Sequence, residues 1–134
     1  MKYRKSRELV VQNFKDAWDA NVVGLDLEFR EDGDNLPKAV FFLTLGDKEL
    51  IDFCGNGRYT AIMGAQIFLV DDGKRSLAEN AADSIAPHIE DKEWADLAEK
   101  IRVNTEAATL RDLGVINGKR VFNLTINITV DNYK

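Results

Sequence analysis

The chain has 134 residues, of which 45% are hydrophobic and 31% charged, with a formal net charge of −5. This length suits a single domain, and the composition is ordinary for a soluble globular protein. The acidic balance argues against a protein that binds nucleic acid by neutralising phosphates, and no apolar run approaches the roughly 20 residues of a membrane span.

Cellular location is predicted from the N-terminal stretch and from the cysteine count. The first residues lack the apolar core of a signal peptide. Cys54 is the only cysteine, so no internal disulfide can form and a reducing compartment fits best. We therefore expect a cytosolic protein, in which the two formal glycosylation sequons at Asn123 and Asn127 stay unused.

The first 30 residues predict a helix followed by a strand. Residues 1–7 carry four basic side chains, typical of a solvated helix start or tail, although they could also contact an acidic partner. Residues 8–21 show apolar positions at helical spacing, which predicts an amphipathic helix. Residues 23–30 alternate apolar and polar side chains, which predicts a strand with one solvated face. The helix's apolar face consists of Val10, Phe14, Ala17 and Trp18.

The middle of the chain predicts two further strands. Residues 32–35 form a turn cluster, and the nearly continuous apolar run 39–45 reads as a more central strand. Residues 59–70 predict a long strand. The connection 46–58 is weakly patterned, although residues 50–53 could form a short edge strand.

We expect this connection to be the most mobile internal segment of an isolated subunit and to become ordered on assembly, since long connections are commonly functional or disordered. Its exposed charges are candidate interaction residues: Asp47, Lys48, Glu49 and Arg58.

A second helical region is predicted after residue 75. Ser76 and Glu79 have the spacing of a capping box, and Pro87 should kink or end the helix. Its stripe of small residues would allow close packing on a sheet. Asp91 would start another helical piece, and residues 102–113 read as an irregular returning strand. The two expected buried stripes are Ala78, Ala81, Ala82, Ile85 and Ile89, then Trp94, Leu97, Ala98 and Ile101.

The last strand is the clearest pattern in the chain. Residues 120–131 alternate strictly, and the preceding Asn117–Gly118 pair is a strong hairpin signal. The apolar side should cover the core, so the polar side should face away from the helices, at the inner wall of a ring or at a subunit contact. That polar side consists of Asn123, Thr125, Asn127 and Thr129.

These elements together predict an α+β domain. The expected order is α-β-β-β-α-α-β-β, with a mostly antiparallel sheet of four to five strands and two to three helices packed on one face.

No catalytic, cofactor or metal site is predicted. His88 is the only histidine, and Cys54 has no base nearby in the sequence. Asp32 begins a run that imitates a calcium loop, but Leu43 stands where the bidentate glutamate should be. The run Gly55–Arg58 lacks the ending of a phosphate-binding loop. We therefore expect a non-enzymatic protein that works through its surface.

The layout resembles the phage tail terminator proteins, the family of the minor tail protein U of lambda-like phages. Shared features are an N-terminal amphipathic helix at residues 7–21, a strand opened by Pro37 in residues 36–43, and a loop at 46–58. A long strand, a helix over 77–89 that ends in Ile-Ala-Pro, and a closing strand that alternates Thr and Ile also correspond. The basic N-terminal run and the Asn-Gly hairpin have no counterpart that we can match.

The resemblance implies an assembly protein that forms a ring, expected to be hexameric. The ring would cap the tail-tube protein, stop tube growth and present a surface to the head-completion or connector protein. An acidic subunit also suits a lumen through which DNA passes without sticking. Such a protein would act in the host cytoplasm during assembly and then stay in the virion tail, without a cofactor.

Two alternatives remain open at this point. The first is another head–tail joining or tail-completion protein of a phage or prophage, which neighbouring genes would distinguish. The second is a small-molecule-binding α+β domain, which would need polar residues at inward strand positions. The inward positions of the last strand are apolar instead, which favours a filled core.

Overall fold

A computed structural model describes residues 2–30, 36–50, 57–70 and 75–133, with the backbone alone for residues 47–50. In chain order the elements are α1 (Tyr3–Asn21), β1 (Leu27–Glu28), β2 (Lys38–Leu50), β3 (Gly57–Val70), α2 (Arg75–Ile89), β4 (Glu93–Asp96), β5 (Ile101–Ile116) and β6 (Lys119–Asn132).

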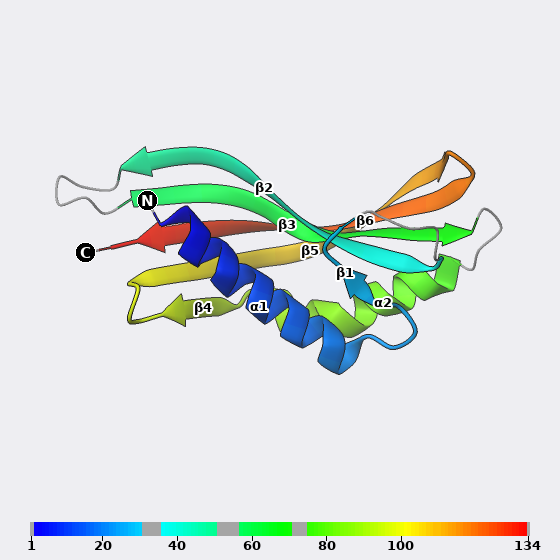
Figure 1. The fold of residues 1–134 in the computed structure, drawn as a ribbon, viewed down its shortest axis with the longest axis horizontal. Coiled ribbons are helices and arrows are strands. Elements are labelled where there is room, and N and C mark those ends of the chain that lie inside the picture. The colour runs from blue at the N-terminus through cyan, green and yellow to red at the C-terminus, as the bar shows by residue number, and fades with distance from the viewer. Residues whose placement is uncertain (1, 31–35, 51–56, 71–74, 134) are drawn as a thin grey trace.

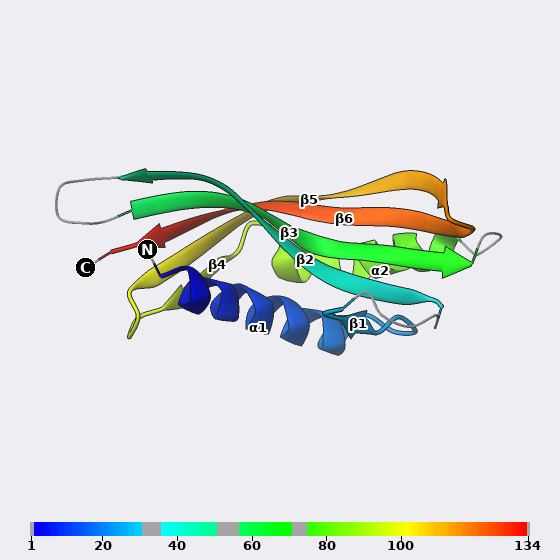
Figure 2. The same ribbon diagram turned by 45° about the horizontal axis from the view of Figure 1, so that its top comes forward.

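The strands form one six-stranded sheet in the order β1-β2-β3-β6-β5-β4. β1 runs parallel to β2, and every other pair is antiparallel. Four long strands make the sheet elongated and strongly twisted (Figure 1), and both helices lie on the same side of it (Figure 2). The α+β class and the mostly antiparallel sheet are confirmed, whereas six strands replace the predicted four to five.

The core lies between the two helices and one face of the sheet. α1 contributes Val10, Phe14 and Trp18, all fully buried, as the helical spacing predicts. The indole N–H of Trp18 donates to the Leu25 carbonyl at 2.8 Å, which satisfies the polar atom of the largest core side chain. Phe14 meets Phe41 of β2 with ring centroids 5.2 Å apart.

The helix α1 begins earlier than residue 8, because the basic N-terminal run forms its first turns. Ser6 is buried, and its hydroxyl donates to the Lys2 carbonyl at 2.7 Å. The Lys2 amide N–H donates to the Asn132 side-chain carbonyl at 3.2 Å. The two ends of the chain therefore lie side by side at one end of the sheet (Figure 1).

The strand predicted over residues 23–30 is much shorter in the structure. Only Leu27 and Glu28 pair with β2, opposite Ala39 and Val40. Leu25 is buried, but it lies before the strand and accepts the Trp18 hydrogen bond instead of extending the ladder.

The helix α2 differs from its prediction at its start. It already includes Arg75, so Ser76 is not its N-cap and the predicted capping box does not start the helix. Pro87 lies inside the last turn, and the helix ends two residues later at Ile89. The small-residue stripe from Ala78 to Ile89 is buried as predicted.

The helical piece predicted from Asp91 is wrong. Asp91 and Lys100 have positive φ angles of 50° and 56°, and between them lies the short strand β4, paired with β5. The Thr105 N–H donates to the Lys92 carbonyl at 2.8 Å, and the Thr105 hydroxyl donates to Ile89. Pairing with β5 therefore outweighs local helical spacing.

The predicted irregular strand over residues 102–113 is the longer, continuous β5. Its register shifts between Thr105 and Ala108 and again between Asp112 and Val115. These bulges interrupt the alternation that would have revealed the strand. The following hairpin agrees with its prediction, since Asn117 and Gly118 have φ angles of 51° and 75°, as a type I′ turn requires.

Near the middle of the sheet, β3 and β6 approach each other very closely at Gly64. A Cβ at this position would lie 1.8 Å from the Leu124 carbonyl oxygen, where no real side chain fits. The ring of Phe42 on β2 closes the same point from the other side, at 3.2 Å. Glycine is therefore required sterically for the close pairing of the two central strands.

Candidate interaction surface

The face of the sheet opposite the helices carries no covering element among the described residues. We call it the open face. Strand alternation places every second residue of β2, β3, β6 and β5 on it. On β2, β3 and β6 its central residues are uncharged: Val40, Phe42, Thr44, Thr60, Ile62, Gln66, Asn123, Thr125, Asn127 and Thr129. On β5, the exposed Arg111 lies opposite Asn123.

The register of β6 is the one the alternation predicts. Phe122, Leu124, Ile126 and Ile128 are at most 2% exposed and face the core. On the open face, Asn127 is exposed, and Asn123, Thr125 and Thr129 are half-buried. The polar residues therefore point away from the helices, as expected, although β6 is a central strand and not an edge.

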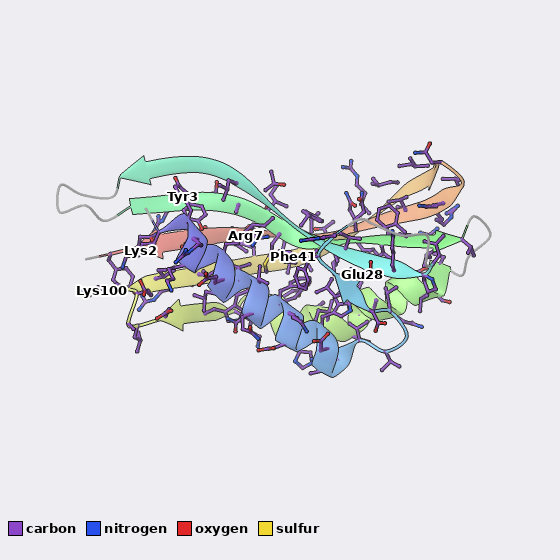
Figure 3. All side chains as sticks on the ribbon, viewed as in Figure 1. Lys2, Tyr3, Arg7, Glu28, Phe41 and Lys100 are labelled. Carbon is purple, nitrogen blue, oxygen red and sulfur yellow. The ribbon has the colours of Figure 1, made fainter. Side chains whose placement is uncertain are left out.

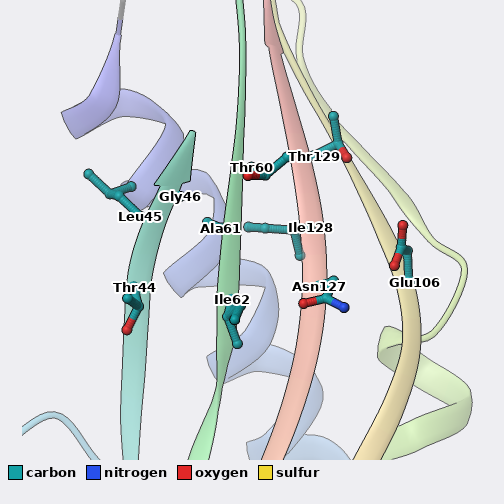
Figure 4. A pocket seen from close by; sticks show the side chains of 10 residues that line it. All are labelled: Thr44, Leu45, Gly46, Thr60, Ala61, Ile62, Glu106, Asn127, Ile128 and Thr129. Carbon is teal, nitrogen blue, oxygen red and sulfur yellow. The ribbon is translucent and has the colours of Figure 1, made fainter. Parts of the chain in front are cut away.

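The open face is hollowed along its length. A depression of about 370 Å³ lies across β2, β3, β6 and β5, and its floor includes Ile62, which is 42% exposed. Figure 4 shows Thr44, Thr60 and Asn127 around it, with Glu106 at one side. A second depression of about 330 Å³ adjoins it through Thr44. These depressions are shallow and mixed in polarity, unlike an enclosed ligand pocket.

The cations of the open face that lie toward the chain ends are paired with carboxylates. Arg58 Nε lies 2.7 Å from Asp131 Oδ1, and Arg102 Nε lies 2.8 Å from Glu93 Oε1. Arg58 therefore lies beside the polar side of β6. The sequence had placed this residue only in the connection 46–58.

The described part of the predicted connection 46–58 is strand. Residues 46–50 continue β2 past a register shift, and residues 57–58 begin β3. The backbone of Asp47, Lys48 and Glu49 therefore lies in β2, and their side chains lie outside the described residues. The expected mobility of the connection and the possible strand at 50–53 fall largely on residues 51–56, also outside the described residues.

A third hollow was not anticipated from the sequence. It holds about 330 Å³ between the start of α1 and the helix-side face of β2 and β3. We call it the α1–β2 groove, and Figure 3 labels two of its lining residues, Tyr3 and Arg7, on the first turns of α1. Its lining residues are Tyr3, Arg4, Arg7, Leu43, Leu45 and Tyr59.

The groove is apolar at its floor and cationic at its rim. Leu45 points to the helix side but is 54% exposed, because α1 does not reach over it. The rings of Tyr3 and Tyr59 pack at a tilt of 47°, with their centroids 5.0 Å apart. Burial raises the pKa of Tyr59, against the opposing effect of a hydrogen bond with Ser6. The sequence could not reveal this groove, because Leu45 reads there as an ordinary core residue.

The opposite end of the sheet carries a carboxylate held in its ionised form. The Gly114 backbone N–H donates to Asp112 at 2.8 Å, and Arg120 lies 3.1 Å from the other carboxylate oxygen. The Gly114 hydrogen bond is the main cause of the lowered pKa of Asp112, with Arg120 adding to it against burial. This arrangement anchors the β5–β6 hairpin.

The residues considered from the sequence for catalysis or for metal and phosphate binding fall in different parts of the chain. His88 is exposed at the end of α2. Cys54, the run 32–35 and the run 55–56 lie outside the described residues. Among the described ranges, no three or more His, Cys, Asp or Glu side chains come together as a metal site. In the same ranges, neither helix is long and apolar enough to cross a membrane.

Comparison with known proteins defines the fold class alone. No protein-family model matches the chain, and no curated protein is significantly similar to it. A solved structure whose name states no function superposes on the whole chain and on 99% of its own length, with a TM-score of 0.73. Its sequence is 13% identical, so the likeness establishes a shared α+β fold and nothing about activity.

Proposed function

We propose that this protein is a phage or prophage tail assembly protein that forms a ring, caps the tail tube and provides the head-joining surface. In this proposal the protein acts without catalysis, cofactor or metal. The proposal rests on one observation above the others: the open face of an elongated curled sheet, whose central positions on β3 and β6 are uncharged. In a ring, such a face could line the central channel, with the helices on the outer side of the sheet.

The composition of the open face supports a channel wall better than a plain solvated surface. A solvated face usually carries Lys and Glu, whereas Thr125, Asn127 and Thr129 are uncharged and lose little side-chain entropy on contact. Arg58 and Arg102 lie beside carboxylates, which reduces their attraction for phosphate. Arg111 and Lys119 also lie on this face, so the low retention of DNA would come from the uncharged stretches of β3 and β6 between them and the paired arginines.

Ring formation would require two different complementary surfaces on each subunit. A head-to-tail contact that closes on rotation makes a ring, while one that does not close makes a filament. The sheet leaves different strands at its two edges, β2 and β4 in the half that contains the chain ends. Contacts between unlike edges would turn the open faces toward a common axis.

The experiment is electron microscopy of the purified protein combined with a tube-length assay. We expect closed rings, and we expect tail-tube protein from the same gene cluster to stop elongating when rings are added. Rings that bind the connector protein but leave tube growth unchanged would instead favour a head–tail joining protein. A protein that stays monomeric alone and in the presence of tubes would refute the proposal.

A further inference from the structure

The turn between β4 and β5 carries an apolar side chain that lies outside the hydrophobic core of the described residues. Leu97 is 79% exposed, although the residues on either side of the turn are buried or half-buried. Two acidic residues lie in the turn, Asp96 before Leu97 and Glu99 after it, and Lys100 follows them. We call residues 96–99 the Leu97 knob.

The knob is held in a fixed shape. The Asp96 carboxylate accepts the Glu99 backbone N–H at 3.1 Å, which closes the turn. Lys2 at the start of α1 donates to the Glu99 carbonyl, and its Nζ also lies 3.8 Å from the Glu99 carboxylate. The positive φ of Lys100 then returns the chain into β5. Since the turn is braced in this way, Leu97 is presented to solvent with little conformational freedom left to lose on binding.

The α1–β2 groove offers this knob an apolar floor and a cationic rim. Its floor offers Leu43, Leu45 and Tyr59 to an aliphatic side chain. Its rim offers Arg4 and Arg7 to carboxylates. Arg4 lies 3.6 Å from Glu8, while Arg7 has no ion pair with any residue of the described ranges.

Knob and groove belong to the same end of the sheet but to opposite edges. The groove opens beside β2, and the knob follows β4, with β3, β6 and β5 between them. The first turn of α1 separates the two, touching the groove through Tyr3 and the knob through Lys2 (Figure 3). One subunit therefore cannot fill its own groove, but the next subunit around a ring can.

We propose that the Leu97 knob of one copy seats in the α1–β2 groove of the next, with Asp96 and Glu99 facing Arg4 and Arg7. This inference rests on the proposed ring and assigns its lateral contact. The contact is heterologous, so it repeats from subunit to subunit until the assembly closes. It also leaves the open face free to line the channel.

The test compares sedimentation and light scattering for four proteins: wild type, Leu97→Asp, Leu45→Asp and the control Val23→Asp. Val23 is 91% exposed beyond the end of α1 and belongs to neither surface. We expect wild type and control to assemble equally. Each of the other variants should weaken the contact by roughly 30-fold or more, as expected for loss of a central interface residue, and run as monomer.

A mixture of the two defective variants gives the sharpest result. Leu45→Asp retains a knob and Leu97→Asp retains a groove, so an equal mixture should form dimers and nothing larger. Arg7→Glu weakens the rim without touching the apolar floor, and it should also reduce assembly. This third variant keeps the test valid if Leu45→Asp lowers the unfolding midpoint.

The outcomes separate the two proposals. Assembly of both Asp variants to the wild-type mass would overturn the knob-and-groove contact while leaving the ring in place. Intact rings that no longer bind tail tubes would assign the groove to the tube protein and likewise overturn it. Failure of the wild type to assemble, with or without tubes, would remove the ring and this contact together.

Discussion

Replacement of Gly64 by alanine is the most direct test of how the sheet is built. The added Cβ would meet the Leu124 carbonyl oxygen at 1.8 Å and its carbon at 2.8 Å. Both are backbone atoms, so no side chain can move aside. β3 and β6 would have to separate until this approach reaches at least 3.0 Å, the shortest that real Cβ atoms show.

The expected loss of stability follows from the hydrogen bonds and packing contacts that this separation disrupts. Gly64 and Ala65 pair with Thr125 and Leu124 in the middle of the longest ladder of the sheet. Two or three hydrogen bonds stretched beyond their range lose about 1 kcal/mol each. Shifting the buried neighbours adds about 1 to 3 kcal/mol. We expect the free energy of unfolding to fall by about 3 to 5 kcal/mol and the melting temperature by roughly 10 to 20 °C.

Gly114→Ala is the matched control. A Cβ there meets no atom within 4 Å, but φ is +79°, so the substitution carries backbone strain without a clash. We expect a loss of about 1 kcal/mol. Urea unfolding should be followed by tryptophan fluorescence at one protein concentration, because assembly shifts apparent stability. A Gly64→Ala loss no larger than that of Gly114→Ala would refute the steric reasoning.

Three further predictions concern the open face, the groove and the core. Asn127→Arg should change the unfolding free energy by no more than about 0.5 kcal/mol and leave the mass of the ring unchanged. The added charge should make the rings retain DNA at low salt. Loss of the ring would show instead that the open face is a subunit contact. Burial raises the pKa of Tyr59 in the folded protein. As pH rises, the phenol proton therefore leaves the unfolded chain before it leaves the folded one, so the free energy of unfolding should fall above about pH 10. Tyr59→Phe should reduce that alkaline loss, and an unchanged pH profile would count against it. Trp18→Phe removes the hydrogen bond to Leu25 and should cost about 2 to 3 kcal/mol by thermal unfolding; a loss under about 1 kcal/mol would mean that water replaces the indole N–H.

The elements predicted well from the sequence are those whose buried face is continuous. The first helix, the strand after Gly57 and the last strand each keep one period over many residues. Their local pattern and their tertiary partners agree, so neither overrides the other. The Asn117–Gly118 turn was equally predictable, because its chemistry is local.

The region from Asp91 to Leu113 shows why the rest could not be predicted. Trp94, Leu97 and Ile101 recur at helical spacing, yet only Trp94 and Ile101 pack on the core. Hydrogen bonds from Thr105 to the chain near Lys92 decide the structure there, and such long-range pairing leaves no local signal. The bulge after Thr105 then hides β5 from a search for alternation.

The candidate surfaces were predictable to different degrees. The alternation in β6 was enough to predict that Asn127 faces away from the core, because the apolar residues occupy the opposite face of the strand. No pattern in the sequence could show that α1 stops short of covering Leu45, or that Leu97 projects from a turn. Exposure of an apolar side chain depends on the reach of a neighbouring element, which only the assembled fold reveals.

The hydrogen bond between Lys2 and Asn132 has a practical consequence for handling the protein. Lys2 and Asn132 lie at the same corner of the sheet, between the groove and the Leu97 knob. An affinity tag at either terminus would therefore compete with an incoming subunit for the same space. The Asn117–Gly118 turn, at the far end of the sheet, is the better place for a tag or a fluorescent label.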